Sequence, residues 1–141
     1  IGNQTLAYRH RDGSFAAELA SARTFCQLRD VELMKNAGLA LGGSLDNAIV
    51  VDDGKILNDG GLRMEREFVR HKALDCLGDL LLLGMPVKAK MTAHRPGHAL
   101  STKLVQALLN DPRAFKIVEA GTSQSRSDSY VLPELAAAAT A

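Results

Sequence analysis

The sequence has few cysteines, no excess of charge of either sign and no long apolar run. Cys26 and Cys76 are its two cysteines; they are too few for a disulfide framework, and we expect both to be reduced thiols. The 17 basic and 16 acidic side chains nearly cancel, so charge gives no reason to expect binding to nucleic acid or to a membrane surface. No apolar run is long enough to cross a bilayer, so we expect no transmembrane segment. These absences favour a cytoplasmic globular protein.

The length of 141 residues suits one domain with a modest hydrophobic core. The first residues are Ile-Gly-Asn-Gln-Thr, with neither an initiator methionine nor a signal-peptide pattern, and we interpret this as an internal start. From Gly121 onward the chain turns to serine, threonine and alanine, which bury little apolar surface. We therefore expect one domain over residues 1–120 and a mobile tail over residues 121–141.

The pattern of apolar residues predicts helices on one side of a small β-sheet. Phe68, Leu74, Leu77 and Leu81 recur at steps of three and four and indicate the longest helix. Short apolar or alternating runs bounded by turn residues indicate the strands. Helices are expected over residues 14–22, 29–36, 65–83, 98–109 and 111–118, and strands over residues 4–9, 47–51 and 87–93. This mixture predicts an α+β two-layer sandwich, with a strand–helix–strand unit at about residues 24–52.

The longest predicted helix carries three polar side chains on one face. His71, Asp75 and Asp79 are each four residues apart, so they project from the same side of the helix. An imidazole nitrogen and a carboxylate oxygen one turn apart can bind one zinc ion. Taken alone, the same spacing is also typical of a solvated helix edge with an ordinary pair between His71 and Asp75. Both interpretations stay open on this segment.

The other histidines lie outside this stripe. His98 follows Pro96-Gly97 at the start of the second amphipathic helix, where a capping or surface histidine is the simplest explanation of this segment alone. His94 is four residues earlier, but the intervening proline and glycine prevent the two from sharing a helical face. His10 stands between two arginines. We interpret His10 and His94 as surface residues.

Four motifs, taken together and in order, make residues 1–118 resemble a known family. The motifs are Ala22-Arg23-Thr24-Phe25, GLALGGSLDNAIVV over residues 38–51, Val69-Arg70-His71-Lys72-Ala73-Leu74-Asp75 with Gly78-Asp79-Leu80, and Gly97-His98-Ala99-Leu100. The chain is similar to the UDP-3-O-acyl-N-acetylglucosamine deacetylase family of Gram-negative bacteria, which acts in lipid A biosynthesis. The resemblance implies two similar α+β domains with the active site between them, and this chain resembles the second domain.

The resemblance also implies an apolar passage for the fatty-acyl chain of the substrate. In the family, the insert of the second domain forms this passage, and the predicted unit over residues 24–52 corresponds to it. The residues placed in the passage are small or apolar. They are Val31, Ala40, Gly43, Ser44, Ala48 and Val50. Phe25 and Lys72 match further substrate contacts of the family.

The same resemblance assigns chemical roles to the polar stripe. The family binds zinc through two histidines and an aspartate, and His71 and Asp75 match two of these ligands. The third histidine and the glutamate that acts as general base belong to the first domain, and no His-x-x-Glu-His-like stretch occurs here. His98 matches the general acid, Asp79 the carboxylate that orients and charges it, and Thr24 the hydroxyl that stabilises the oxyanion.

The chain departs from the family pattern near the fourth motif. Ser101 and Thr102 stand where the family often has two amides, and Arg95-Pro96 precedes the Gly-His pair. These differences affect contacts to the nucleotide, not the groups that carry the chemistry.

The resemblance implies zinc-dependent hydrolysis of the N-acetyl group of UDP-3-O-acyl-N-acetylglucosamine, which gives a free amine and acetate. The missing first domain is then the partner that completes the site. Two alternatives are a non-catalytic module that binds the acyl chain and the nucleotide, and a structural metal-binding domain. His71, Asp75, Asp79 and His98 together favour the enzyme, because a binding module has no need of a general acid.

Overall fold

The computed structural model describes residues 1–119 and the backbone of residues 135–139. The helices are α1 (Ser14–Glu18), α2 (Leu28–Asn36), α3 (Glu67–Leu80), the 3₁₀ turn η1 (Leu81–Leu83) and α4 (His98–Asn110). The strands are β1 (Gln4–Tyr8), β2 (Thr24–Gln27), β3 (Ala48–Asp52), β4 (Lys55–Ile56), β5 (Thr92–His94) and β6 (Leu135–Ala139). In this part of the chain no helix is long and apolar enough to cross a membrane, and both cysteines are free thiols.

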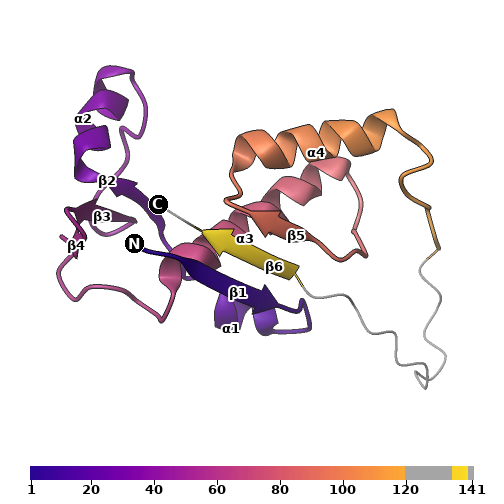
Figure 1. The fold of residues 1–141 in the computed structure, drawn as a ribbon, viewed down its shortest axis with the longest axis horizontal. Helices are drawn as coiled ribbons and strands as arrows, with labels where there is room; N and C mark the ends of the chain where they lie inside the picture. The colour runs from indigo at the N-terminus through magenta and orange to yellow at the C-terminus, as the bar shows by residue number, and fades with distance from the viewer. Residues whose placement is uncertain (120–134, 140–141) are drawn as a thin grey trace.

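The strands form two small mixed sheets with helices packed against them (Figure 1). In the first sheet β6 lies between β1 and β5, antiparallel to β1 and parallel to β5. In the second sheet β3 lies between β2, its parallel neighbour, and β4, its antiparallel neighbour. α2 connects the parallel pair β2 and β3, as parallel neighbours require a crossover. This architecture confirms the predicted α+β class.

Helix α3 is the element shared by both halves of the core. Its Val69 and Ala73 pack with Leu6, Tyr8 and Leu19 beneath the first sheet. Its Phe68 packs with Ile49 and Val51 of the second sheet. The remaining side of α3 meets α4. Because α3 contacts both sheets and α4, any residue on it has a fixed position relative to β2 and to the start of α4.

A buried ion pair joins the beginning of α3 to the beginning of β2. Glu67 is fully buried and Arg23 is 8% exposed, and the Arg23 Nε to Glu67 Oε1 distance is 2.9 Å. Burial by itself raises the pKa of the Glu67 carboxyl, but hydrogen bonds from Arg23 and Arg63 outweigh it and hold the pKa below its usual range. Both side chains are therefore charged inside the protein.

Four local predictions need correction or qualification. The helix expected over residues 14–22 ends at Glu18. The predicted helix over residues 65–83 ends as an α-helix at Leu80 and continues as η1. The strand expected over residues 87–93 is confined to Thr92–His94, the residues that β6 pairs with. The helix expected over residues 111–118 is absent. Asp111 instead accepts hydrogen bonds from the backbone of Arg113 and Ala114 in a single turn.

The shortened strand and the absent helix have the same cause: these segments lack neighbouring elements to pair or pack with. An alternating pattern indicates which side of a segment is apolar, but a strand also needs a neighbouring ladder. In residues 111–118, the side chains of Phe115, Ile117 and Val118 are exposed, so a helix there has nothing to pack against in the described structure. The predicted mobile tail, residues 121–141, lies outside the described residues apart from the backbone of β6.

Leu19 offers a test of the core beneath the first sheet. It is fully buried in the cluster with Tyr8 and Val69. We expect Leu19→Ala to lower the free energy of unfolding by about 2–5 kcal/mol, because it leaves a cavity. The control is Leu82→Ala, at a side chain that is 63% exposed, which should change it by less than about 0.5 kcal/mol. Urea denaturation followed by circular dichroism measures both, and equal effects would contradict this description of the core.

Candidate functional site

The polar stripe of α3 forms a compact cluster with the start of α4. His71 Nε2 lies 3.4 Å from Asp75 Oδ1, and both side chains are largely buried. Asp79, one turn further, is hydrogen-bonded to His98. The structure therefore brings together the four residues that the sequence predicted for metal binding and acid catalysis.

The position of His71 is set by a backbone carbonyl. His71 Nδ1 lies 3.1 Å from the carbonyl oxygen of Ala22, just before β2. A carbonyl oxygen can only accept a hydrogen bond, so in the neutral ring Nδ1 carries the proton. The lone pair of the ring is then on Nε2, the nitrogen that faces Asp75. A neutral imidazole in this tautomer is the form that binds a metal ion.

His71 and Asp75 fit two positions of a zinc site. Two ligand atoms bound to one tetrahedral zinc ion at about 2.0–2.1 Å lie about 3.3–3.4 Å apart. The separation of His71 Nε2 and Asp75 Oδ1 is 3.4 Å. Within residues 1–119, no group of three histidine, cysteine or acidic side chains is arranged to hold a metal ion. The donors present thus suit a zinc ion that receives further ligands from elsewhere.

His98 presents one ring nitrogen to a carboxylate and the other to the cluster. Its Nδ1 lies 3.0 Å from both Oδ1 and Oδ2 of Asp79, and its Nε2 lies 4.0 Å from Asp75 Oδ1. The hydrogen bond to Asp79 and then the charges of Asp75 and Asp79 raise the pKa of His98, while slight burial and Lys72 oppose them. The ring is therefore held as an imidazolium to higher pH than an ordinary histidine.

The loop before His98 is anchored to α3. Lys72 Nζ donates a hydrogen bond to the carbonyl oxygen of Pro96 at 2.8 Å. Arg95 has a left-handed backbone with φ of 49°, an unfavourable conformation for a residue with a side chain. Gly97 then enters α4 as its N-cap in an extended conformation. This sharp turn and the Lys72 contact place His98 beside Asp79.

Phe25 connects the polar cluster to the second sheet. Its ring packs edge-on against Phe68, with centroids 5.0 Å apart, and lies 6.3 Å from the His71 ring. Lys72 Nζ lies 5.7 Å from the Phe25 centroid, within the range of a cation–π contact. Thr24, the first residue of β2, is exposed beside it. The predicted contacts Phe25 and Lys72 therefore lie together next to His71.

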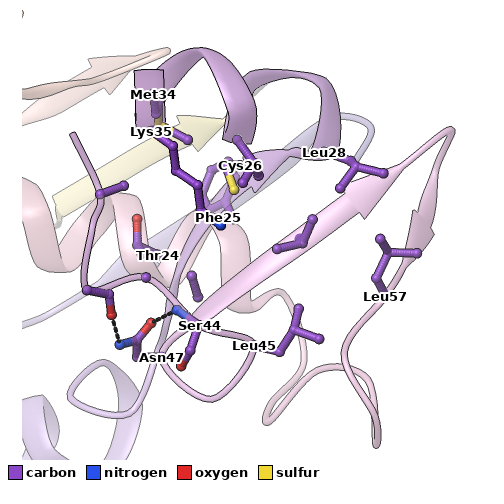
Figure 2. Close-up of a pocket in the computed structure, with 16 residues that line it drawn as sticks. Thr24, Phe25, Cys26, Leu28, Met34, Lys35, Ser44, Leu45, Asn47 and Leu57 are labelled. Carbon is purple, nitrogen blue, oxygen red and sulfur yellow. Dashed lines mark hydrogen bonds between the residues drawn. The ribbon is translucent and has the colours of Figure 1, made fainter. Parts of the chain in front are cut away.

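An apolar pocket of about 660 Å³ lies between β2, α2, the loop after α2, and β3 (Figure 2). The six residues predicted to form a passage all line it: Val31, Ala40, Gly43, Ser44, Ala48 and Val50. Thr24 and Phe25 line it as well. Phe25 therefore belongs both to the pocket wall and to the surroundings of His71, whose ring centroid lies 6.3 Å from its own.

Other lining residues were not predicted from the sequence. They are Cys26, Leu28, Met34, Lys35, Gly42, Leu45, Asn47 and Leu57. The apolar members among them are widely spaced in sequence, and α2 places Leu28, Val31 and Met34 at steps of three, a periodicity that could have indicated them. Asn47 holds the loop by accepting from the backbone of Ser44 and donating to the carbonyl of Gly42 (Figure 2).

Glycine at position 43 suits a close approach within this loop. A Cβ atom there would lie 3.0 Å from the carbonyl oxygen of Ala40, tighter than nearly all Cβ contacts, so Ala40 would have to shift. The side chains of Ala40 and Ala48 are small as well. Small residues therefore let this loop fold closely on itself where it lines the pocket.

The α+β fold thus carries a His–Asp pair with the spacing of two metal ligands, near an apolar pocket. The family described as UDP-3-O-acyl N-acetylglycosamine deacetylase matches residues 1–110. The chain belongs to this family, as its motifs predicted.

Curated relatives agree with the family assignment. A UDP-3-O-acyl-N-acetylglucosamine deacetylase from Anaeromyxobacter sp. (strain Fw109-5) is 53% identical over 118 residues, covering 84% of this chain and 39% of that protein. The protein of the same name from Myxococcus xanthus is 57% identical over 120 residues, covering 85% and 38%. That from Campylobacter hominis is 49% identical over 118 residues, covering 84% and 40%. The chain thus spans about two fifths of the length of these relatives.

Asp79→Asn tests the electrostatics of His98. The amide can still contact the ring but removes a negative charge, so we expect the pKa of His98 to fall toward the ordinary range of histidine. The imidazolium is then lost at lower pH than in the unaltered chain. NMR titration of the His98 ring protons measures the shift. The matched control is Asp12→Asn at an exposed aspartate; an equal pKa of His98 in all three proteins would contradict the Asp79 contact.

Proposed function

We propose that this chain supplies the second half of a zinc-dependent deacetylase, which hydrolyses the N-acetyl group of UDP-3-O-acyl-N-acetylglucosamine to a free amine and acetate in lipid A synthesis. The observation that carries the proposal is the meeting of two histidine–carboxylate pairs, His71–Asp75 and His98–Asp79, in one cluster. The names of relatives about half identical in sequence support the same activity.

His71 and Asp75 would hold the zinc ion from one side. The third ligand, a histidine, and the general base, a glutamate, would come from the first domain. Zinc, when bound, supplies a Lewis acid and lowers the pKa of coordinated water toward about 7. The His71 tautomer set by Ala22 leaves Nε2 free for this role.

His98 would protonate the leaving nitrogen. An amine is a poor leaving group unless it receives a proton, so the reaction needs an acid on that side of the amide. With Nδ1 occupied by Asp79, the transferable proton of the His98 imidazolium is on Nε2. The Thr24 hydroxyl would donate a hydrogen bond to the oxyanion that develops on the carbonyl oxygen.

The apolar pocket would bind the fatty-acyl chain of the substrate. Its volume of about 660 Å³ lies in the usual range for ligand pockets. Each methylene transferred from water into such a pocket contributes about 0.8 kcal/mol. Phe25 and Lys72, at the junction of pocket and cluster, would contact the part of the substrate between acyl chain and amide.

The first domain is the partner that the proposal requires. Leu81 and Leu82 lie two and three residues after Asp79, and Leu100 lies two residues after His98; all three side chains are exposed. Exposed apolar side chains close to a site are a feature of surfaces that another domain covers. The complete enzyme would act in the cytoplasm of a Gram-negative bacterium. The alternative is a non-catalytic module that binds the acyl chain and the nucleotide, and the His98–Asp79 pair argues against it.

Activity measured with and without an added first domain tests the proposal. We expect deacetylation only when both parts are present. In the active pair, His98→Ala should lower kcat by about 10²–10⁴-fold, the usual scale for loss of a general acid, while zinc content stays unchanged. The control His94→Ala, at the exposed histidine of β5, should leave both unchanged. Substrate binding without turnover would favour the binding module, and zinc loss in His98→Ala would make His98 a ligand.

Ala48→Ile tests the acyl passage. Ala48 lines the pocket from β3, and a larger side chain there should hinder a long-acyl substrate by about 1–3 kcal/mol, the scale of overpacking. KM and kcat for long- and short-acyl substrates measure the effect. Ala37→Ile, at an exposed position just after α2, is the control. An equal loss with both substrates would argue that Ala48 does not line the passage.

A further inference from the structure

Glu67 is the most constrained polar side chain of the described structure outside the cluster. It is fully buried, and its carboxylate accepts four hydrogen bonds. Oε1 accepts from the backbone N and from Nε of Arg23, at 3.0 and 2.9 Å. Oε2 accepts from Arg23 Nη2 at 3.1 Å and from the backbone N of Arg63 at 2.6 Å. The role proposed for the chain makes no use of this group.

Arg23 is held at two points by the same carboxylate. Its guanidinium binds Glu67 through Nε and Nη2, the two-pronged geometry that arginine forms and lysine cannot. Nη2 also donates to the carbonyl of Gly61 at 2.9 Å. The backbone N–H of Arg23 donates separately to Glu67. The main chain at residue 23 is therefore fixed as firmly as the side chain.

The peptide group between Ala22 and Arg23 links this pair to His71. A peptide group is planar and trans, so its N–H and its C=O point in opposite directions from one rigid plane. The N–H of this peptide is Arg23 N, bound to Glu67. Its C=O is Ala22 O, which contacts His71 Nδ1. Glu67 and His71 are four residues apart on α3, so one peptide spans two side chains from adjacent turns.

We propose that Glu67 and Arg23 are positioning residues that fix the tautomer and orientation of the His71 ring through the Ala22–Arg23 peptide. Because the peptide group is planar, holding the Arg23 N–H also fixes the direction of the Ala22 carbonyl. The carbonyl then keeps the proton on Nδ1 and the lone pair on Nε2. The consequence for zinc affinity rests on the proposed function; the consequence for the His71 tautomer does not.

The first experiment reads the His71 ring directly in the full chain. In Glu67→Gln, an NH₂ group replaces one carboxylate oxygen and faces donors of Arg23 or Arg63, and the charge is lost, so the anchor of the peptide is weakened. The ¹⁵N chemical shifts of His71, recorded at a pH where the ring is neutral, should change from those of a single Nδ1–H tautomer to those of a mixture. Glu65→Gln, at an exposed glutamate two residues earlier, is the control. Unchanged His71 shifts in folded Glu67→Gln would overturn the proposal.

A second variant separates positioning from simple loss of stability. Breaking a buried pair from one side destabilises a protein strongly, whereas replacing both partners by apolar residues of similar size is often neutral. The double variant Arg23→Met with Glu67→Leu should therefore recover part of the melting temperature lost in Glu67→Gln, because the backbone N–H groups of residues 23 and 63 still lose their acceptor. We expect its His71 to remain a tautomer mixture. A double variant with both the stability and the His71 shifts of the unaltered chain would show that the pair is merely structural.

The third measurement is the zinc affinity of the two-domain protein, in which this chain is joined by its first domain. Loss of a group that orients a metal-binding histidine typically weakens metal binding about 10–100-fold. We expect a loss of this size in the double variant, measured by competition with a chelator, and no change in Glu65→Gln. Absence of zinc binding in the unaltered protein would count against the proposed function, while the His71 tautomer would still decide the role of Glu67 and Arg23.

Discussion

The rest of the structure depends on a charge buried at the beginning of α3. Removing a carboxylate from water is costly unless its oxygen atoms are fully hydrogen-bonded, and Glu67 meets that condition with donors from Arg23 and Arg63. These donors belong to the start of β2 and to the loop before α3. One side chain therefore fixes the second sheet against the helix that carries the polar cluster. An apolar pair could fill the same space but could not accept from the backbone of Arg23 and Arg63, so the ion pair also fixes the main chain at both positions.

The 3.6-residue period of α3 allows one helix to serve the core and the site together. Phe68, Val69 and Ala73 face the two sheets and are buried. His71, Asp75 and Asp79 follow the four-residue row on another side, where α4 brings His98. The position of the polar row is thus fixed by the packing of the apolar rows.

The sequence was informative where a pattern is local. The period of α3, the one-turn spacing of His71 and Asp75, and the α+β class all follow from residues close together in the chain. The contact of Arg23 with Glu67 joins residues 44 positions apart, and no periodicity reports such a pair. His71 contacts the backbone carbonyl oxygen of Ala22. Every residue has such an oxygen, so the sequence cannot show which one His71 contacts. The roles of Thr24 and Lys72 came from the family resemblance and not from spacing.

The site residues differ in their exposure to solvent, and under the proposed function this difference affects proton transfer from His98. His71, Asp75 and Asp79 are mostly buried, but the His98 side chain is 71% exposed. Electrostatic interactions weaken in water, so an exposed imidazolium is a less effective proton donor than a desolvated one. A first domain that covers the cluster would add a zinc ligand and a base, and it would also exclude water from His98. The division of the site between two domains then couples catalysis to their association, because this chain holds the acid in place but leaves it in solvent.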